Sequence, residues 1–252
     1  HTQTLSLLKG CLTFVFVNPI LLPMKNYFLA YKKFWMAFFA LSAVILYLFY
    51  NALKPKVILP IYQPSMVNTE LVDSTVQFIR KYHTIPNFSL VNQLGDTISQ
   101  DTFKDKIYIA DFFFTTCLTI CPIMTGHMGA IQEAIKDQED VLLLSHSVTP
   151  ERDSVSVLYQ YGIEKGVNPK KWHLVTGPKK DIYDLARKSY LVAKDEGGSG
   201  PFDLVHTENF VLIDKQKRIR GYYDGTDPAA IETLLEDLKV LQATYAEIAA
   251  KK

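Results

Sequence analysis

The sequence predicts an α/β fold, with helices on both faces of a sheet, preceded by one N-terminal transmembrane helix. Three observations support this prediction. Residues 34–53 contain no charged side chain, which is typical of a membrane span. From residue 85 onward, short apolar runs that suit buried strands alternate with segments whose apolar residues recur at helical spacing. The chain has 252 residues, of which 48% are hydrophobic, so it can form one domain of ordinary size or two small ones.

The charge composition excludes several classes of protein. Only 21% of the residues are charged and the formal net charge is +1, so the chain is neither disordered nor suited to nucleic acid. Its 3 cysteines are too few to stabilise a disulfide scaffold of this length. Residues 1–56 carry 6 of the 27 basic residues and no acidic one, while all 26 acidic residues lie in the rest of the chain. This division indicates a basic membrane anchor joined to a mildly acidic domain.

The predicted anchor spans residues 34–53. As a helix these residues would extend about 30 Å, which matches the hydrocarbon core of a bilayer. Trp35 lies at one end, and Tyr47 and Tyr50 lie near the other, as in an aromatic belt. A cleaved signal peptide is disfavoured, because the apolar run is long and no small-x-small cleavage site follows Tyr50. Three lysines shortly before the span, against two after it, predict a cytoplasmic N-terminus and a domain on the outer side.

The segments on either side of the anchor are predicted from their composition. Residues 1–33 are expected to form a cytoplasmic tail, in which residues 1–23 are a gene-call extension because Met24 would make a normal start. Residues 54–84 are expected to form a proline-rich linker and a short amphipathic helix over Leu71–Tyr82.

The first half of the domain shows a hairpin, a strand, a helix and another strand. Phe88–Val91 and Thr97–Ser99 flank a glycine-containing turn, which predicts the hairpin. The apolar run Lys106–Phe114 suits a central strand covered on both faces. Pro122–Gln138 has apolar residues at helical spacing, and Val141–Ser147 is a second buried strand.

The second half of the domain continues the alternation. The predicted helices are Asp153–Tyr161, Lys180–Ser189 and a C-terminal helix from Pro228 to about Ala249. The predicted strands are Trp172–Val175 and the hairpin pair Asn209–Ile213 and Ile219–Tyr223. Asp153 is expected to cap the first of these helices and Gly162 to end it, and residues 197–201 form a glycine-rich loop. The pattern therefore predicts one domain over residues 85–252.

Two cysteines form the most informative pair in the sequence. Cys117 and Cys121 follow the strongest strand and come just before Pro122, at the start of a helix. Unpaired N–H groups and the positive helix end lower the pKa of a thiol at such a position. Two converging thiolates can bind a soft metal or form a disulfide, and three intervening residues favour the metal. The alternative, two cysteines that merely pack as small apolar residues, is disfavoured by their place in the pattern.

A metal site needs a further ligand beyond two thiolates. Copper(I) accepts three soft or borderline ligands, and imidazole is a suitable third. Sequence position favours His206 slightly over His146, which ends a strand near the predicted site, whereas His127 lies too far along its helix. A closed four-ligand zinc cage fits poorly, and no carboxylate is placed beside the cysteines as a general base for catalytic zinc.

These residues resemble the Sco/SenC family of thioredoxin-like copper chaperones over roughly residues 60–240. The matching segments are Asp111–Cys117 with Cys121-Pro122, Ser145–Asp153, Trp172, and Val205-His206-Thr207 before Asn209–Asp214. The resemblance implies a thioredoxin-like sheet and a copper ion held by Cys117, Cys121 and His206. It also implies assembly of the dinuclear copper centre of cytochrome c oxidase, with that enzyme's copper-bearing subunit and a copper donor protein as partners.

The resemblance leaves the activity open. Family members are described as delivering copper, as reducing cysteines of the target, or as both. We expect a metallochaperone rather than an enzyme, with a thiol-disulfide oxidoreductase using Cys117 and Cys121 as the alternative. A peroxidase of the peroxiredoxin type fits the spacing poorly, and a copper or redox sensor stays open. The family often has proline after the first cysteine and an acidic residue between the two, where this chain has Leu118-Thr119-Ile120.

The expected location is a bacterial inner membrane, with a single span and the soluble domain facing the periplasm. Family members are typically tethered to a membrane with the domain outside the cytosol. The leader contains no arginine, which argues against a mitochondrial transit peptide.

Overall fold

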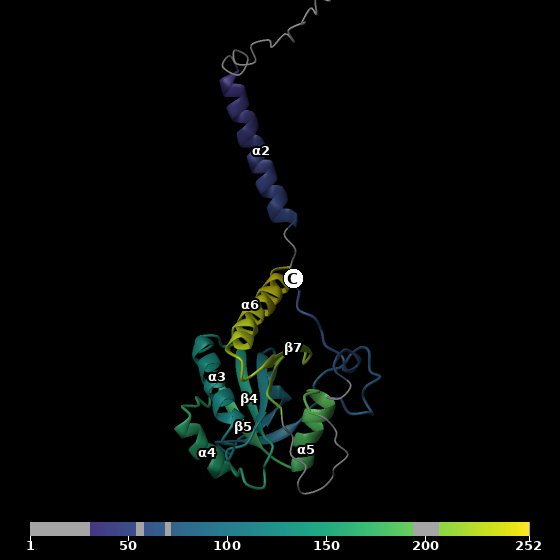
Figure 1. Ribbon diagram of the computed structural model, residues 1–252, viewed down its shortest axis with the longest axis vertical. Coiled ribbons are helices and arrows are strands. Elements are labelled where there is room, and N and C mark those ends of the chain that lie inside the picture. Colours follow the sequence, from purple (N-terminus) through teal and green to yellow (C-terminus); the bar gives the residue numbers. More distant parts are fainter. Residues whose placement is uncertain (1–30, 54–57, 69–71, 194–206, 252) are drawn as a thin grey trace, which may run out of the picture. The chain divides into compact units, whose positions relative to one another are not determined.

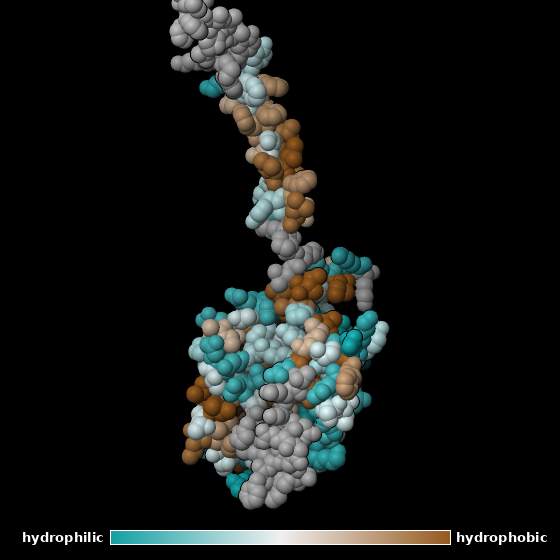
Figure 2. Space-filling model, turned by 45° about the vertical axis from the view of Figure 1, so that its right-hand side comes forward, coloured by the Kyte–Doolittle hydropathy of each residue, from teal (hydrophilic) through white to brown (hydrophobic). Residues whose placement is uncertain are grey.

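The computed structural model describes residues 31–53, 58–68, 72–193 and 207–251. The chain divides into two compact units, His1–Lys56 and Val57–Lys252. In the first unit the described residues form helix α2, Lys32–Leu53, whose 22 residues contain no buried side chain. By length and composition it is the one helix in the described part of the chain that could cross a membrane, and it fits the predicted anchor. Figure 2 shows apolar side chains along it.

The second unit is built on a seven-stranded sheet with the order β2-β1-β5-β4-β3-β6-β7. The strands are β1 Ser89–Asn92, β2 Thr97–Ser99, β3 Ile107–Phe113, β4 Val141–Ser147, β5 Trp172–Thr176, β6 Asn209–Ile213 and β7 Ile219–Asp224. β3, β4 and β5 are parallel neighbours, and the other pairs are antiparallel. Each predicted strand is therefore confirmed, and no strand end shifts by more than one residue. Every residue of β3 and β4 is buried, as the near-continuous apolar runs predict for central strands.

Helices cover both faces of this sheet (Figure 1). The helical segments are α3 Ile120–Ala134, α4 Val155–Glu164, α5 Lys179–Asp184 and α6 Pro228–Ala250, with 3₁₀ turns Pro64–Met66 (η1) and Gln100–Phe103 (η3) and a π-helical turn Leu185–Ser189 (η4). On one face, α3, α4 and α6 pack on odd-numbered β3 residues such as Ile109. On the other, α5 and η4 pack on even-numbered ones such as Tyr108 and Phe112. The predicted α/β layers are confirmed.

The predicted helix over Leu71–Tyr82 is wrong where the structure describes it. Residues 74–78 form turns instead, because the Asp73 side chain accepts a hydrogen bond from the Thr75 N–H at 2.8 Å. Tyr82 adopts a positive φ of 66°, which a right-handed helix does not allow. Buried Val72 and half-buried Val76 still pack on the core of the α5 face, which accounts for the amphipathic pattern.

Two helix ends differ from those predicted. α4 is capped by Ser154, not Asp153, and the Ser154 hydroxyl accepts a hydrogen bond from the Val157 N–H. Gly162 lies inside α4, and the chain turns out of the helix at Gly166, whose φ is +68°. The predicted helix Lys180–Ser189 is divided into α5 and the π-helical turn η4. The glycine-rich loop, residues 197–201, lies outside the described residues.

Candidate functional site

The cysteine pair lies where β3 leads into α3. The helix begins at Ile120, two residues before the predicted start, and ends at Ala134 rather than Gln138. Cys117 is half-buried, Cys121 is buried, and both are free thiols. The N–H group of Cys121 lies 3.5 Å from the Cys117 sulfur, and the Thr119 hydroxyl lies 3.6 Å from it. Thr119 is the N-cap residue of α3, but its side chain accepts no hydrogen bond from the helix. The Cys117 sulfur instead accepts from the Cys121 N–H, as an N-cap side chain would.

The two thiols differ in acidity. Burial opposes ionisation of Cys117, but the backbone N–H groups of Cys121 and Thr119 outweigh it and lower the pKa of Cys117 to about 7. Burial raises the pKa of the Cys121 thiol to about 12. Cys117 is therefore the accessible thiolate near neutral pH. Cys121 needs a nearby positive charge, such as a metal ion, before it ionises.

Asp111 lies on the face of β3 that packs against α3. The side chain is only 2% exposed, and burial raises its pKa to about 7, although a hydrogen bond from Ser145 lowers it in part. The Trp172 indole N–H donates to the same Ser145 hydroxyl at 2.8 Å. One oxygen of Asp111, Oδ1, has no hydrogen-bond partner among the described residues. The carboxyl is thus buried and only half satisfied, and its negative charge adds to the effect of burial on Cys121.

A second buried carboxylate, Asp153, supports the loop before Cys117, and sequence reasoning missed this role. Its oxygens accept hydrogen bonds from the hydroxyls of Ser147 at 2.5 Å, Thr115 at 2.5 Å and Thr149 at 3.0 Å. Phe113 and Ser147 are register partners in parallel strands, so both strands deliver these hydroxyls to one edge of the sheet. The sequence contained one signal for this role, namely hydroxyl residues at or just after the ends of two predicted buried strands.

The structure separates the histidines that the sequence offered as ligands. The ring of His146 stacks on Phe112 with 4.7 Å between centroids, on the face of the sheet opposite to Cys121. Burial lowers the pKa of His146 to about 4. His146 is therefore excluded as a partner of the cysteines. His127 bonds the Gly225 carbonyl oxygen at 2.7 Å, in agreement with a packed side chain.

His206 lies outside the described residues, so the proposed three-ligand set stays a prediction. The described residues contain no group of three or more histidines, cysteines or carboxylates that could hold a metal. β6 runs antiparallel to β3, with Ala110 opposite Val211 and Tyr108 opposite Ile213. The first residue of β6, Asn209, is therefore at the same edge of the sheet as the end of β3, from which the cysteine loop begins.

The cysteine loop presents an apolar surface. Leu118, between the cysteines, is 91% exposed, and Ile123 in the first turn of α3 is 49% exposed. Pro122 is also exposed. These exposed side chains lie within six residues of Cys117 along the chain, and such an apolar surface suits contact with another protein.

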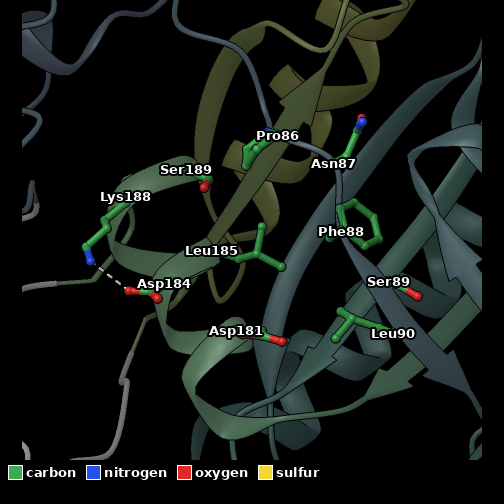
Figure 3. Close-up of a pocket in the computed structure, with 10 residues that line it drawn as sticks. All are labelled: Pro86, Asn87, Phe88, Ser89, Leu90, Asp181, Asp184, Leu185, Lys188 and Ser189. Carbon is green, nitrogen blue, oxygen red and sulfur yellow. Dashed lines mark ion pairs between the residues drawn. The ribbon is translucent and has the colours of Figure 1, made fainter.

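A cavity of about 720 Å³ lies on the face of the sheet that α5 and η4 cover, opposite to Cys121 (Figure 3). It opens between the residues that lead into β1 and the α5–η4 segment. Phe88, Leu90 and Leu185 supply its apolar part, and Lys188 pairs with Asp184 at 2.8 Å on its polar side. Neither cysteine lines it. The cysteine site is thus a surface site rather than part of this cavity.

Comparison with known proteins points to one family. The family model described as SCO1/SenC matches residues 77–242. The SCO1 protein homolog of Bacillus subtilis (strain 168) is 30% identical over 161 residues, which cover 62% of this chain and 82% of that protein. The SCO2-like protein of Rickettsia felis is 27% identical over 154 residues, covering 60% and 74%.

Solved structures agree. A SCO1/SenC family lipoprotein from Bacillus anthracis has a TM-score of 0.54 and 30% identity, and the match covers 64% of this chain and 95% of that one. BsSco, described as a member of the Sco family of cytochrome c oxidase assembly proteins with a disulfide switch, has a TM-score of 0.55 and 29% identity, covering 64% and 94%. Arabidopsis thaliana ScoI with copper bound has a TM-score of 0.50 and 26% identity, covering 62% and 98%. The expected thioredoxin-like fold is confirmed.

Proposed function

Because the chain belongs to the SCO1/SenC family, we propose that it is a membrane-anchored copper chaperone in the assembly of cytochrome c oxidase. The observation that carries the proposal is the arrangement of the sulfurs, with the Cys121 N–H held 3.5 Å from the Cys117 sulfur at the start of a helix. Relatives support the cargo and the process, since Arabidopsis ScoI binds copper and BsSco belongs to a family of oxidase assembly proteins.

In this proposal copper is held by Cys117, Cys121 and His206. Thiolates and imidazole are ligands that copper(I) prefers, and three ligands leave one side of the ion open for transfer. Binding requires both thiols to lose their protons. Cys117 does so readily, and the charge of the ion offsets the burial that keeps Cys121 protonated. The start of β6 at the edge where β3 ends supports His206 as the third ligand.

The remaining parts of the chain receive matching roles. Residues 1–33 form a cytoplasmic tail, 34–53 a single span of a bacterial inner membrane, 54–84 a linker, and 85–252 the copper-binding domain in the periplasm. Helix α2, with apolar side chains exposed along its length, supports the anchor. The exposed apolar side chains beside Cys117 support docking of a copper donor and of the copper-bearing subunit of the oxidase.

Copper titration of the reduced full chain in uncharged detergent, against a competing copper(I) chelator, tests the ligand set. We expect one copper per chain, and loss of tight binding in Cys117→Ser, Cys121→Ser and His206→Ala. His127→Ala is the matched control, because this imidazole bonds a backbone carbonyl and should leave copper binding unchanged. Unchanged affinity in His206→Ala would remove this histidine from the site.

A second function is favoured by the acidity of Cys117 and by the disulfide switch described for BsSco. In this function the Cys117 thiolate attacks a disulfide of a partner protein, and Cys121 resolves the mixed disulfide. Two thiols of this chain become one disulfide, and the partner's disulfide becomes two thiols, so electrons and protons balance. Reduction of a partner disulfide that survives His206→Ala, with copper binding lost, would favour the oxidoreductase over the chaperone.

A further inference from the structure

A second cavity lies at the opposite end of the parallel strands from the cysteine loop. Its volume is about 700 Å³. Lys106 comes directly before β3, Glu139 lies two residues before β4, and Lys171 comes directly before β5. Because these three strands are parallel, their first residues meet at one edge, and the seven residues of β3 separate this edge from the cysteines by about 20 Å.

The wall of this cavity concentrates positive charge. It includes Lys106, Lys136, Lys170 and Lys171. The Lys106 ammonium donates to the Glu139 backbone oxygen at 2.7 Å, and the Lys171 ammonium donates to the backbone oxygen of Gln138. Among the described residues, Lys106, Lys170 and Lys171 have no carboxylate within ion-pair distance, whereas Lys136 pairs with Glu133. Two ammonium groups are therefore held in place by backbone oxygens, and neither forms an ion pair with a described carboxylate.

Asp137 and Glu139 also line the cavity and oppose an anion. Their two carboxylates reduce the positive potential of the three unpaired lysines, Lys106, Lys170 and Lys171, without cancelling it. A compact anion that reaches the lysines at the strand edge is therefore favoured over an extended one.

A buried histidine adds a hydrogen-bonding group to the same wall. His173 in β5 is 9% exposed and packs edge-on against Phe103, with 6.2 Å between ring centroids. Its Nδ1 atom is buried and has no hydrogen-bond partner among the described residues. Burial lowers the pKa of His173, so the ring is neutral and can donate one N–H. A buried polar atom without a partner costs free energy, and rotation of the ring toward the cavity would let an acceptor oxygen recover it.

We propose that this cavity binds a phosphate-type oxyanion through Lys106, Lys170, Lys171 and His173. The oxygens of the anion accept charge-assisted hydrogen bonds from the ammonium groups and a further hydrogen bond from the imidazole N–H. The anion is either a free phosphate compound or the phosphate of a lipid headgroup. The site is separate from the cysteines, because the length of β3, about 20 Å, lies between the two.

Calorimetric titration of the full chain in uncharged detergent with sodium pyrophosphate, at constant ionic strength, tests the site. Lys170→Gln is the preferred variant, since none of its side-chain contacts holds the fold among the described residues. We expect it to weaken binding about tenfold, as the loss of one charged hydrogen bond predicts. Lys239→Gln, on the exposed side of α6, is the matched control and should bind as the original chain does.

A second measurement covers variants that lose stability. His173→Gln and Lys171→Gln should also weaken binding, while melting temperatures without the anion show whether each variant is folded. Micelles that contain phosphatidylglycerol distinguish the source of the phosphate. If this lipid competes with pyrophosphate for the original chain but not for Lys170→Gln, the site binds a lipid headgroup. If the lipid does not compete with pyrophosphate, the site binds a free phosphate compound. Equal weakening by Lys170→Gln and Lys239→Gln, or no binding of pyrophosphate and phosphatidylglycerol to the folded chain, would overturn the proposal.

Discussion

Replacing Asp111 by asparagine removes a buried carboxyl whose titration affects the stability of the domain. Asparagine has nearly the same shape and can still accept the hydrogen bond from Ser145, but it carries no proton to lose. At low pH, where Asp111 is neutral in both the native and the unfolded state, the variant and the original chain should have similar free energies of unfolding.

The size of the effect follows from the two pKa values. The pKa of Asp111 rises from 3.8 in the unfolded chain to about 7 in the native one. Between these values the native state binds a proton that the unfolded state has released, so stability is highest below about pH 4 and falls as the pH rises toward 7. Each pKa unit corresponds to about 1.4 kcal/mol, so the loss is at most about 4 kcal/mol. Asp111→Asn should therefore be more stable than the original chain at pH 8, by up to this amount.

Urea unfolding of the reduced, copper-free chain in uncharged detergent measures this difference. Trp172 lies in the core beside Ser145 and reports unfolding by fluorescence, with Trp35 replaced by phenylalanine in both proteins. Free energies of unfolding at pH 4, 6 and 8 should converge at the lowest pH and separate at the highest. Parallel pH profiles for the two proteins would refute the reasoning, because they would show that Asp111 does not titrate between these values in the native state.

Three further predictions concern the loop and the core. The rate of alkylation of Cys117 by iodoacetamide in the copper-free chain should rise with pH through a midpoint near 7, because the thiolate is the nucleophile; mass spectrometry measures it, and a midpoint near 9 would contradict the stabilisation by N–H groups. Asp153→Ala should lower the free energy of unfolding by about 3 kcal/mol, since it leaves three hydroxyls without their acceptor, and a loss within the range of surface substitutions would show that water replaces the carboxylate. Ile131→Ala, fully buried in α3, should cost about 2 to 5 kcal/mol in urea unfolding, whereas Ile123→Ala in the same helix should cost less than about 0.5 kcal/mol; equal costs would mean that α3 does not pack as described.

Local patterns in the sequence were sufficient for much of the fold. Apolar runs such as Lys106–Phe114 identified the central strands, because a strand buried on both faces must be apolar throughout. The cysteine pair could also be predicted, since the end of a strand followed by a helix start is a local feature. The Leu71–Tyr82 prediction was wrong because hydrogen bonds of the Asp73 side chain stabilise turns there, while the packing of Val72 and Val76 on the core gives the sequence a helix-like amphipathic pattern.

The sequence by itself determined which residues are proposed to carry the chemistry, whereas the tertiary structure decided which of the described side chains face one another. His146 and Asp111 both lie near strand ends, yet register and alternation place them on opposite faces of the sheet, and only Asp111 shares a face with Cys121. Asp153 reads as a helix cap until the pairing of β3 with β4 brings three hydroxyls to its carboxylate. The physical reason is that strand pairing joins residues distant along the chain, and no local pattern encodes its register.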